Sequence, residues 1–403
     1  MKKRSIVVLF AAILLSACNG AVDSADSMPT ALVDSTETAV PTATSPQPPP
    51  DIINTHLRWQ WGDFTPVALA DAGDQVVVLT TDGSVVWLDE ATGELLDEYR
   101  LWSGILEGNV TGEVLTDGQM VIVAAHQNPI QSSGDYQARL IAFDDPTSES
   151  WALPVLPDQQ TYLATLSGDR LITAISSPGL EPSHLSAYDL ESGERHWQIE
   201  NGEIPSIRQI TGHGDKVFTL FDGVEGGRID ARLDNGTKWW EWIDPVAPQP
   251  DLLLNGESLY AMGVSRVQAL DHEDGKPRWH VDLDIAISAG SAASKENIYI
   301  VPAPSAETEF RSGVISLDAL SGNLEWHALG GMLVEALSVQ DDTLWVLTRD
   351  VEQGTVSLSG LEAQTGLEKI RVAVDGSPNV LYRLVAGDGN IYVLGDVLYA
   401  YGP

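Results

Sequence analysis

An eleven-residue pattern, A-x-D-x-x-[ST]-G-x-x-x-W, recurs along this chain and constrains its fold more than any other feature. Its clearest copies span residues 187–197, 269–279 and 316–326. An apolar strand that ends in Asp and is followed by Ser or Thr and then Gly predicts a tight turn, because the carboxylate can accept turn hydrogen bonds and Gly tolerates positive φ. The Trp then lies at a fixed point of the next strand. Its large apolar body and single N–H donor suit a position between neighbouring sheets.

Weaker copies extend the pattern over the rest of the chain. Two of them keep the turn but have Asp97 or Ile370 in the Trp place, and a third lacks the Gly and has Trp151 one residue early. We expect the structural positions of the repeat to be Asp89, Gly93, Asp144, Asp189, Gly193, Trp197, Gly236, Trp240, Asp271, Gly275, Trp279, Asp318, Gly322, Trp326 and Gly366, together with Trp59.

The spacing of the copies predicts the number of blades. The residues in the Ala place are 87, 142, 187, 231, 269, 316, 360 and 400, so successive copies lie 38 to 55 residues apart. A period near 40 to 45 residues is typical of propeller blades. Each interval also holds two further short apolar runs, which indicates four strands per blade.

The two ends of the repeat region complement each other. The last copy stops shortly after Ala400, before any turn or Trp, whereas Trp59 lies in an apolar segment that no turn precedes. Pairing these two segments would remove an open sheet edge. The sequence therefore predicts an all-β fold, an eight-bladed β-propeller of four-stranded antiparallel blades in which the N-terminal strand completes the last blade.

The N-terminal residues indicate export and lipid attachment. Residues 2–4 are basic, residues 6–15 form an apolar run too short to span a bilayer, and small residues precede Cys18, the only cysteine of the chain. The segment resembles bacterial lipoprotein signals, which implies cleavage before Cys18 and lipidation there. An ordinary signal peptide with an incidental cysteine is the alternative.

These observations divide the chain into three parts. We expect residues 1–17 to be a lipoprotein signal peptide, residues 18–53 to hold the lipidated Cys and a disordered Pro/Ser/Thr-rich tether, and residues 54–403 to form a single propeller. The propeller would then be a monomeric body in the cell envelope, anchored by lipid to the extracytoplasmic side of a membrane.

The charge of the chain excludes some partners. Its 58 acidic residues outnumber its 22 basic residues and give a formal net charge of −36. Nucleic acids and anionic lipid surfaces are bound through basic patches, so neither is an expected partner. Solvated surface is the simplest explanation of so much acid, and a cation-rich setting is the alternative.

No motif indicates catalysis or a cofactor. The eight histidines include no H-E-x-x-H pattern, G-x-S-x-G is absent, and residues 271–275 fit a repeat turn better than a calcium loop. The recurring Trp residues could stack on a sugar or a quinone, but burial in the core explains their recurrence without a ligand. We therefore expect no catalytic, cofactor-binding or metal-binding residues.

The connections differ between the two faces of the predicted ring. Longer segments at 126–137, 176–184 and 302–313 fall between second and third strands, on the face that also carries the connections 100–112 and 243–251. The turns with Asp and Gly on the other face are short and alike. Because loops carry function more often than scaffolds do, we expect protein partners to bind the loop-rich face.

The repeat resembles the pyrroloquinoline-quinone-type propeller repeat, and with the lipoprotein signal the whole chain is similar to the BamB-type lipoproteins. This resemblance implies a non-enzymatic scaffold that binds protein partners, with a role in assembly of envelope or outer-membrane proteins. A quinone-dependent dehydrogenase with the same fold is the alternative, although many of these enzymes carry a cysteine pair that this chain cannot form. A glycan-binding propeller on the cell surface is a third hypothesis.

Overall fold

The computed structural model describes most of the repeat region. The described ranges are 55–102, 108–129, 137–157, 161–176, 184–200, 207–221, 227–243, 251–303, 313–350, 353–375, 382–387 and 389–402. They belong to the compact unit Pro49–Pro403. No helix found in these ranges has the length and apolarity needed to cross a membrane.

The strands are numbered in chain order and grouped here by blade. Blade 1 is β2 (Pro66–Asp71), β3 (Gln75–Thr80), β4 (Ser84–Asp89) and β5 (Leu95–Arg100); blade 2 is β6 (Gly108–Thr116), β7 (Val121–Pro129), β8 (Gln137–Phe143), β9 (Trp151–Ala152) and β10 (Leu156–Pro157). Blade 3 is β11 (Thr161–Ser167), β12 (Arg170–Ser176), β13 (His184–Asp189) and β14 (Arg195–Glu200); blade 4 is β15 (Ile207–His213), β16 (Lys216–Phe221), β17 (Arg228–Leu233) and β18 (Lys238–Ile243).

The second half follows the same plan. Blade 5 is β19 (Asp251–Asn255), β20 (Ser258–Met262), β21 (Arg266–Asp271) and β22 (Pro277–Asp282); blade 6 is β23 (Ile287–Ala293), β24 (Asn297–Pro302), β25 (Val314–Asp318) and β26 (Leu324–Ala328). Blade 7 is β27 (Leu333–Gln340), β28 (Thr343–Arg349), β29 (Val356–Glu362) and β30 (Glu368–Val374); blade 8 is β31 (Arg383–Ala386), β32 (Ile391–Leu394), β33 (Leu398–Gly402) and β1 (His56–Trp61).

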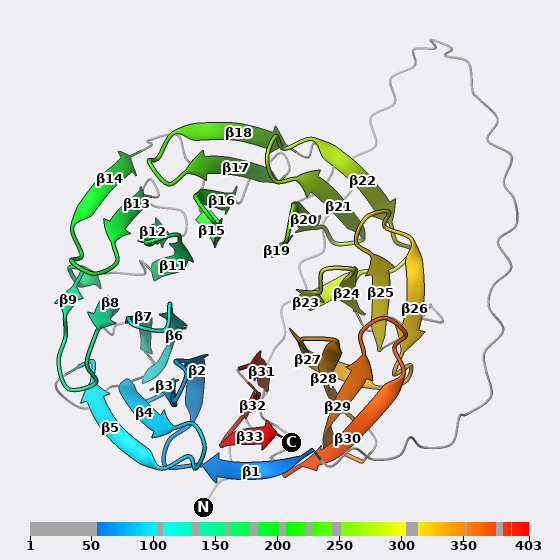
Figure 1. The fold of residues 1–403 in the computed structure, drawn as a ribbon, viewed down its shortest axis with the longest axis horizontal. Coiled ribbons are helices and arrows are strands. Elements are labelled where there is room, and N and C mark those ends of the chain that lie inside the picture. Colours follow the sequence, from blue (N-terminus) through cyan, green and yellow to red (C-terminus); the bar gives the residue numbers. More distant parts are fainter. Residues whose placement is uncertain are drawn as a thin grey trace, which may run out of the picture. The chain divides into compact units, whose positions relative to one another are not determined.

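The eight sheets follow one another around a ring in chain order, with the first strand of each blade nearest the axis (Figure 1). Neighbouring strands within each sheet are antiparallel. The predicted eight-bladed propeller of four-stranded blades is confirmed. Blade 2 carries one irregularity, because its outer strand is split into β9 and β10, which both pair with β8.

The N-terminal strand closes the ring, as the sequence predicts. In β1, Trp59 lies opposite Ala400 and Trp61 opposite Leu398 of β33. Both Trp side chains are buried, whereas Leu57 and Gln60 on the same strand are exposed. This alternation is expected of a strand that covers a sheet edge with one face and meets solvent with the other.

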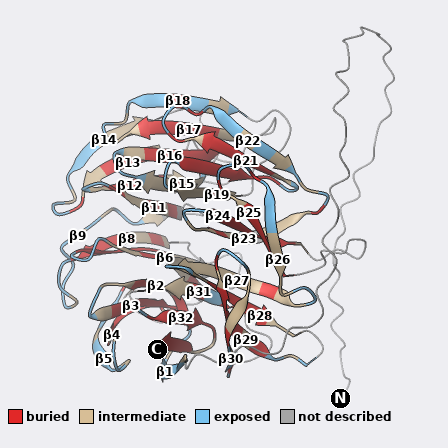
Figure 2. Ribbon diagram, turned by 45° about the vertical axis from the view of Figure 1, so that its right-hand side comes forward, coloured by how far each residue is buried: buried red, intermediate tan, exposed pale blue. Residues whose placement is uncertain are grey.

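The core of the molecule lies between the blades. Each of the eight clusters of buried apolar side chains joins two adjacent blades. Second and third strands are rich in β-branched and aromatic residues and are almost fully buried, whereas the outer strands carry long exposed stretches, as β18 and β22 do in Figure 2. We call each interface between adjacent blades a junction and name it by its two blades. The side chains that fill the junctions therefore hold adjacent blades of the ring together.

Candidate functional site

The turn after the third strand has the same hydrogen bonds in several blades. In blade 3, the Asp189 carboxylate accepts hydrogen bonds from the backbone N–H of Ser192 at 2.8 Å and from its hydroxyl at 2.6 Å. The N–H of Gly193 donates to the Asp189 carbonyl at 2.9 Å, and Gly193 has a φ of 68°. A side chain at that φ would be strained, so Gly is favoured there.

The turns after the third strands of other blades repeat this arrangement with some variation. The pairs Asp89–Thr92 and Asp318–Ser321 make the same two bonds. Hydrogen bonds from the Ser or Thr hydroxyl, followed by those from its N–H, hold the pKa of Asp89 and of Asp189 below the ordinary value of 3.8. Asp271 differs, because Arg278 takes the place of the missing hydroxyl as its main partner.

A second contact joins each of these turns to the blade before it. The Trp of one blade lies against the turn Gly of the next, so that a Cβ added at Gly275 would come within 2.6 Å of the Trp240 ring. The indole N–H of Trp240 donates to the carbonyl of His272, the first residue of the same turn, at 3.0 Å. Six junctions share this Trp–Gly contact, formed by Trp59 with Gly93, Trp151 with Gly193, Trp197 with Gly236, Trp240 with Gly275, Trp279 with Gly322 and Trp326 with Gly366.

In every one of these six junctions the indole N–H donates to the carbonyl of the residue after the third-strand Asp or its counterpart. A buried Trp N–H without an acceptor is costly, so the bond fixes the ring orientation as well as its depth. Gly is required twice over at the turn, for its positive φ and for the space that the indole occupies.

The Trp belongs to a row of three residues that are paired across the blade. In blade 4, Phe218 of the second strand lies opposite Ala231 of the third, which lies opposite Trp240 of the fourth. The small middle residue leaves room for the two rings, whose centroids are 5.8 Å apart. In blade 5 the row is Tyr260, Ala269 and Trp279.

The second-strand aromatics of this row are buried core residues that the repeat pattern alone does not reveal. Tyr299 and Trp326 both donate to the Ala363 carbonyl, at 3.0 and 3.2 Å. Tyr260 and Trp279 share the Ala319 carbonyl in the same way, each at 3.1 Å. A short sequence signal exists, because an apolar residue, a Tyr and another apolar residue recur at 259–261, 298–300 and 391–393.

Two junctions lack the Trp–Gly contact. At junction 7–8 the row is Trp345, Gly360 and Ile370, so the Trp lies on the second strand. Blade 8 offers no third-to-fourth-strand turn, because its third and fourth strands, β33 and β1, come from the two ends of the repeat region. The large ring of Trp345 instead packs in the buried cluster of blades 7 and 8.

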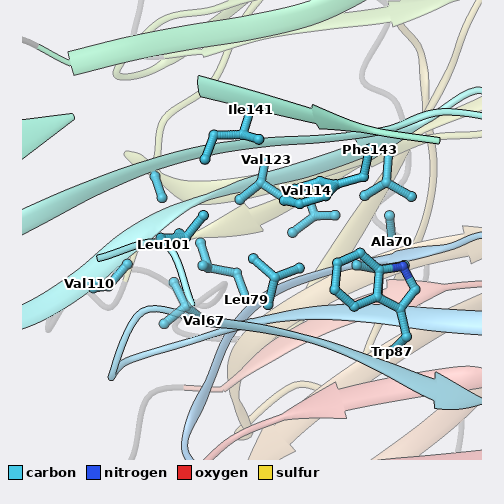
Figure 3. Close-up of a cluster of buried hydrophobic side chains, with 14 residues drawn as sticks. Val67, Ala70, Leu79, Trp87, Leu101, Val110, Val114, Val123, Ile141 and Phe143 are labelled. Carbon is cyan, nitrogen blue, oxygen red and sulfur yellow. The ribbon is translucent and has the colours of Figure 1, made fainter. Parts of the chain in front are cut away.

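At junction 1–2 the row is Val77, Trp87 and Asp97, so the Trp lies on the third strand. Trp87 is 2% exposed, and its ring meets the Phe143 ring of blade 2 edge to face with centroids 5.3 Å apart. Figure 3 shows these two rings on the same side of the cluster that blades 1 and 2 share. The following turn, which begins at Asp144, has no Gly, and Asp144 accepts a hydrogen bond from the Ser150 hydroxyl.

Junction 1–2 contains a cavity of about 160 Å³. Trp87, Phe143 and Val121 are its buried apolar walls, and exposed residues form its mouth. The residues that line it are Ala72, Asp74, Gln75, Trp87, Thr116, Gly118, Gln119, Val121, Phe143, Asp144, Asp145 and Pro146. Asp145 follows the third-strand Asp, so its carbonyl corresponds to the one that accepts the indole N–H in the six other junctions.

The charge at the mouth of the cavity is negative. Asp74, Asp144 and Asp145 are all exposed there. Hydrogen bonds from the hydroxyl and the N–H of Thr147 lower the pKa of Asp145, so this carboxylate is ionised at neutral pH. The cavity thus has an acidic rim and a mainly polar accessible lining, with Trp87 and Phe143 almost fully buried behind it.

The inner strands are joined to each other by polar side chains. Gln209 of β15 donates to the Leu252 carbonyl of β19 at 2.9 Å and accepts from the Leu252 N–H at 2.7 Å. Arg383 of β31 donates to the Val67 carbonyl of β2 at 2.9 Å. Desolvation raises the pKa of Glu113 and of Asp251, which both lie on these strands. These groups brace the inner wall of the ring.

The described residues show how the acidic side chains are grouped and neutralised. Within them, no three or more His, Cys, Asp and Glu side chains are grouped so that they could hold a metal ion. The buried carboxylate of Asp230 is neutralised by Arg228 at 2.8 Å, with Arg232 and Lys238 also nearby. Cys18 and most of the long segments expected to form the loop-rich face lie outside the described ranges. One expected connection is shorter than 100–112, since β6 already begins at Gly108.

The fold, the Asp turn and the Trp–Gly contact together define a propeller built from pyrroloquinoline-quinone-type repeats. A family model described as outer membrane protein assembly factor BamB matches residues 62–199 and 263–402, which is more than half of the chain. The chain belongs to this family. A search of the curated proteins found no match by sequence.

Solved structures share the fold at low sequence identity. BamB from Moraxella catarrhalis superposes with a TM-score of 0.60 at 17% identity, over 87% of this chain and 98% of that one. The computationally designed Ika8 protein gives 0.63 at 12% identity, over 85% and 98% of the two chains. A quinohemoprotein alcohol dehydrogenase from Comamonas testosteroni gives 0.59 at 12% identity, over 87% and 76%. At these identities the likeness concerns the fold.

Proposed function

We propose that this protein is a non-enzymatic scaffold of the cell envelope that is held at a membrane by lipid on Cys18 and binds other proteins. The observation that carries the proposal is membership of the BamB family, supported by a structural likeness to a BamB. The name of that family refers to assembly of outer-membrane proteins, a process that depends on contacts between proteins. Assembly of envelope proteins is therefore the role that we propose for this chain.

The chemistry of the chain supports binding rather than catalysis. Three kinds of polar group described above make bonds that hold the ring together. They are the turn carboxylates, the buried carboxylate of Asp230 and the polar groups of the inner strands. A rigid ring with charged outer strands offers a large stable surface for a partner. Its strong negative charge favours partners with basic surfaces and raises their rate of encounter.

Crosslinking in the native cell tests the proposal. An amine-reactive or photoreactive crosslinker, followed by purification of the protein and mass spectrometry, is expected to yield one or a few envelope proteins joined to the propeller. The control is the same purification from cells that lack the protein. Recovery of no partner above this control would contradict the scaffold role.

A dehydrogenase that uses pyrroloquinoline quinone is the second candidate, because a quinohemoprotein alcohol dehydrogenase shares the fold. Incubation of the purified protein with pyrroloquinoline quinone and Ca²⁺ distinguishes the two functions. We expect no saturable binding and no dye reduction with alcohols or sugars as substrates. Turnover of either substrate class would replace the scaffold proposal with an enzymatic one.

The proposed anchor has its own test. Residues 1–17 would be removed as a signal peptide, Cys18 would carry the lipid, and residues 19–53 would be a tether. Cys18→Ala is expected to abolish incorporation of labelled palmitate and to release the protein from the membrane fraction, because only a thiol can accept the diacylglyceryl group. Retention of label in the variant would show that the lipid lies elsewhere.

A further inference from the structure

The cavity at junction 1–2 lies beside the blade 2 turn whose counterparts in six other junctions are covered by a Trp. In those junctions the preceding blade supplies the indole, and the carbonyl after the third-strand Asp accepts its N–H. At junction 1–2 the preceding blade supplies Asp97 instead, which does not line the cavity, whereas Asp145, the residue after the third-strand Asp, does. An aromatic side chain packed beside this kind of turn is therefore the arrangement that the other junctions use.

The size of the cavity fits one aromatic ring. A cavity of about 150 Å³ in a protein core can bind benzene, and this one measures about 160 Å³. Trp87 and Phe143, whose rings meet edge to face, are among the residues that line it.

The mouth of the cavity indicates the charge of the segment that would carry the ring. Asp74, Asp144 and Asp145 are exposed around it, and the chain as a whole has a net charge of −36. A segment with Lys or Arg beside its aromatic residue would meet opposite charge on entry, whereas an acidic segment would be repelled. The carbonyl of Asp145 accepts a hydrogen bond from Ser148 at 3.3 Å and has a second lone pair for an indole N–H.

We propose that the cavity at junction 1–2 is a docking site for an aromatic side chain, preferably Trp, on a basic segment of a partner protein. This inference rests on the proposed scaffold function and names one contact through which that function would work. A single aromatic residue in a desolvated pocket commonly dominates the energy of a protein interface. The acidic rim would add selectivity for a basic segment.

A short peptide tests the site directly. The probe is acetyl-Lys-Lys-Trp-Lys-Lys-amide with 5-fluorotryptophan, and its ¹⁹F signal is followed during titration with the purified full-length protein. We expect saturable binding that weakens at least tenfold when Ala replaces the fluorotryptophan of the peptide in a calorimetric titration. Binding is also expected to weaken as NaCl rises, because the rim charges are exposed and screened by salt.

Three variants locate the binding. Ala72→Phe places a ring in the cavity and is expected to weaken binding at least tenfold, and Asp74→Lys is expected to weaken it several-fold by reversing one rim charge. Asp342→Lys is the matched control, because Asp342 holds the same turn position in blade 7 and its carbonyl accepts the same type of hydrogen bond. This variant changes the net charge equally and is expected to leave binding within twofold of the original. Circular dichroism and melting curves establish that each variant is folded.

Several results would overturn the site. They are absence of saturable binding by the Trp peptide, equal binding of the Ala peptide, and unchanged binding by both Ala72→Phe and Asp74→Lys. Free indole that binds as tightly as the peptide would also overturn it, in favour of a small-molecule pocket. If the peptide fails to bind but crosslinking in cells still recovers a protein partner, this inference fails and the scaffold function stands. If crosslinking recovers no partner while the peptide binds as expected, the scaffold function fails and the pocket's ligand preference stands.

Discussion

Junction 4–5 and junction 1–2 are built from equivalent strands, yet one is closed by a Trp and the other contains a cavity. In junction 4–5, Trp240 lies on Gly275 and donates to the His272 carbonyl. In junction 1–2 both halves of this contact have changed, because Asp97 replaces the Trp and the next turn has no Gly. A Trp without the Gly would clash, and a Gly without the Trp would leave a gap. The contact therefore behaves as one unit shared by two blades.

The rows of three paired residues across the blades also show that the volume of the side chains is shared between neighbouring strands. Blade 4 has Phe, Ala and Trp, blade 1 has Val, Trp and Asp, and blade 7 has Trp, Gly and Ile. Each row keeps one Trp, but its strand differs. Cores tolerate exchanges that conserve volume better than changes of total volume. At junction 1–2 the exchange is incomplete, because moving the Trp inward to the third strand leaves a space beside the turn of blade 2.

Removal of the strand that closes the ring is expected to have the largest effect. Deleting residues 19–61 removes β1 with its two buried Trp residues, breaks the Trp59–Gly93 contact and exposes the edge of β33. The loss should be comparable with the roughly 5–15 kcal/mol that stabilise a typical domain. Deletion of residues 19–50 alone should leave the melting temperature nearly unchanged. Equal melting curves for the two deletions would contradict closure by β1.

Truncation of a junction Trp should have the next largest effect. Trp240→Ala removes a side chain that is 9% exposed and is expected to cost about 3–5 kcal/mol in the free energy of unfolding. Asp97→Ala changes the same row position at the junction that lacks the contact and should cost less than about 0.5 kcal/mol. Urea unfolding of both variants measures the difference. A small loss for Trp240→Ala would mean that the contact does not hold the blades together.

Substitution of the turn Gly separates backbone strain from the clash with Trp. Gly256 has a φ of 54°, and a Cβ added there would meet nothing within 4 Å. In Gly256→Ala, left-handed backbone strain alone should therefore cost roughly 1–2 kcal/mol. Gly275→Ala adds contact with the Trp240 ring and should cost more. In the Trp240→Ala background this excess should disappear, because the two positions act as one unit. An unchanged excess there would place the strain in the turn itself.

The turn carboxylates should produce the smallest effect, which depends on pH. The pKa of Asp189 is lowered in the folded protein, so its contribution to stability is fully present above the ordinary value of 3.8 and is lost as pH falls through the lowered value. Asp189→Asn should therefore melt slightly below the original protein at neutral pH, and the difference should shrink in acid. Ser192→Ala should show part of the same behaviour, since its hydroxyl supplies the leading bond. A difference that persists unchanged in acid would exclude the carboxylate as its cause.

The sequence predicts this fold well because its signals are local. The turn and its Trp lie at a constant spacing, so counting copies yields the blades, and the two incomplete ends yield the closure. The rows across the blades are not local. From the second strand to the third, the paired residues run from 260 to 269 in blade 5 but from 299 to 316 in blade 6, because the loop between them varies. No fixed spacing could have revealed these aromatic partners.

The candidate site escaped sequence reasoning for a related reason. Asp97 and the turn at Asp144 each look like drift of one copy when they are considered alone. Only the ring shows that the Trp place of blade 1 faces the turn of blade 2. The cavity is lined by residues of two different repeats, which the sequence alone does not place together.

The pairing of β1 with β33 also determines how the molecule can be assembled over time. Seven sheets form from contiguous residues, but the eighth joins residues far apart in the sequence, such as Arg58 and Asn390, which are 332 positions distant and share a hydrogen bond of 2.7 Å. The entropy of closing so long a loop grows only slowly with its length, whereas the search for such distant contacts delays folding. Until β1 arrives, the edge of β33 is open to the same strand of a neighbouring molecule. Exchange of β1 between chains is therefore the misassembly that this closure invites at high concentration.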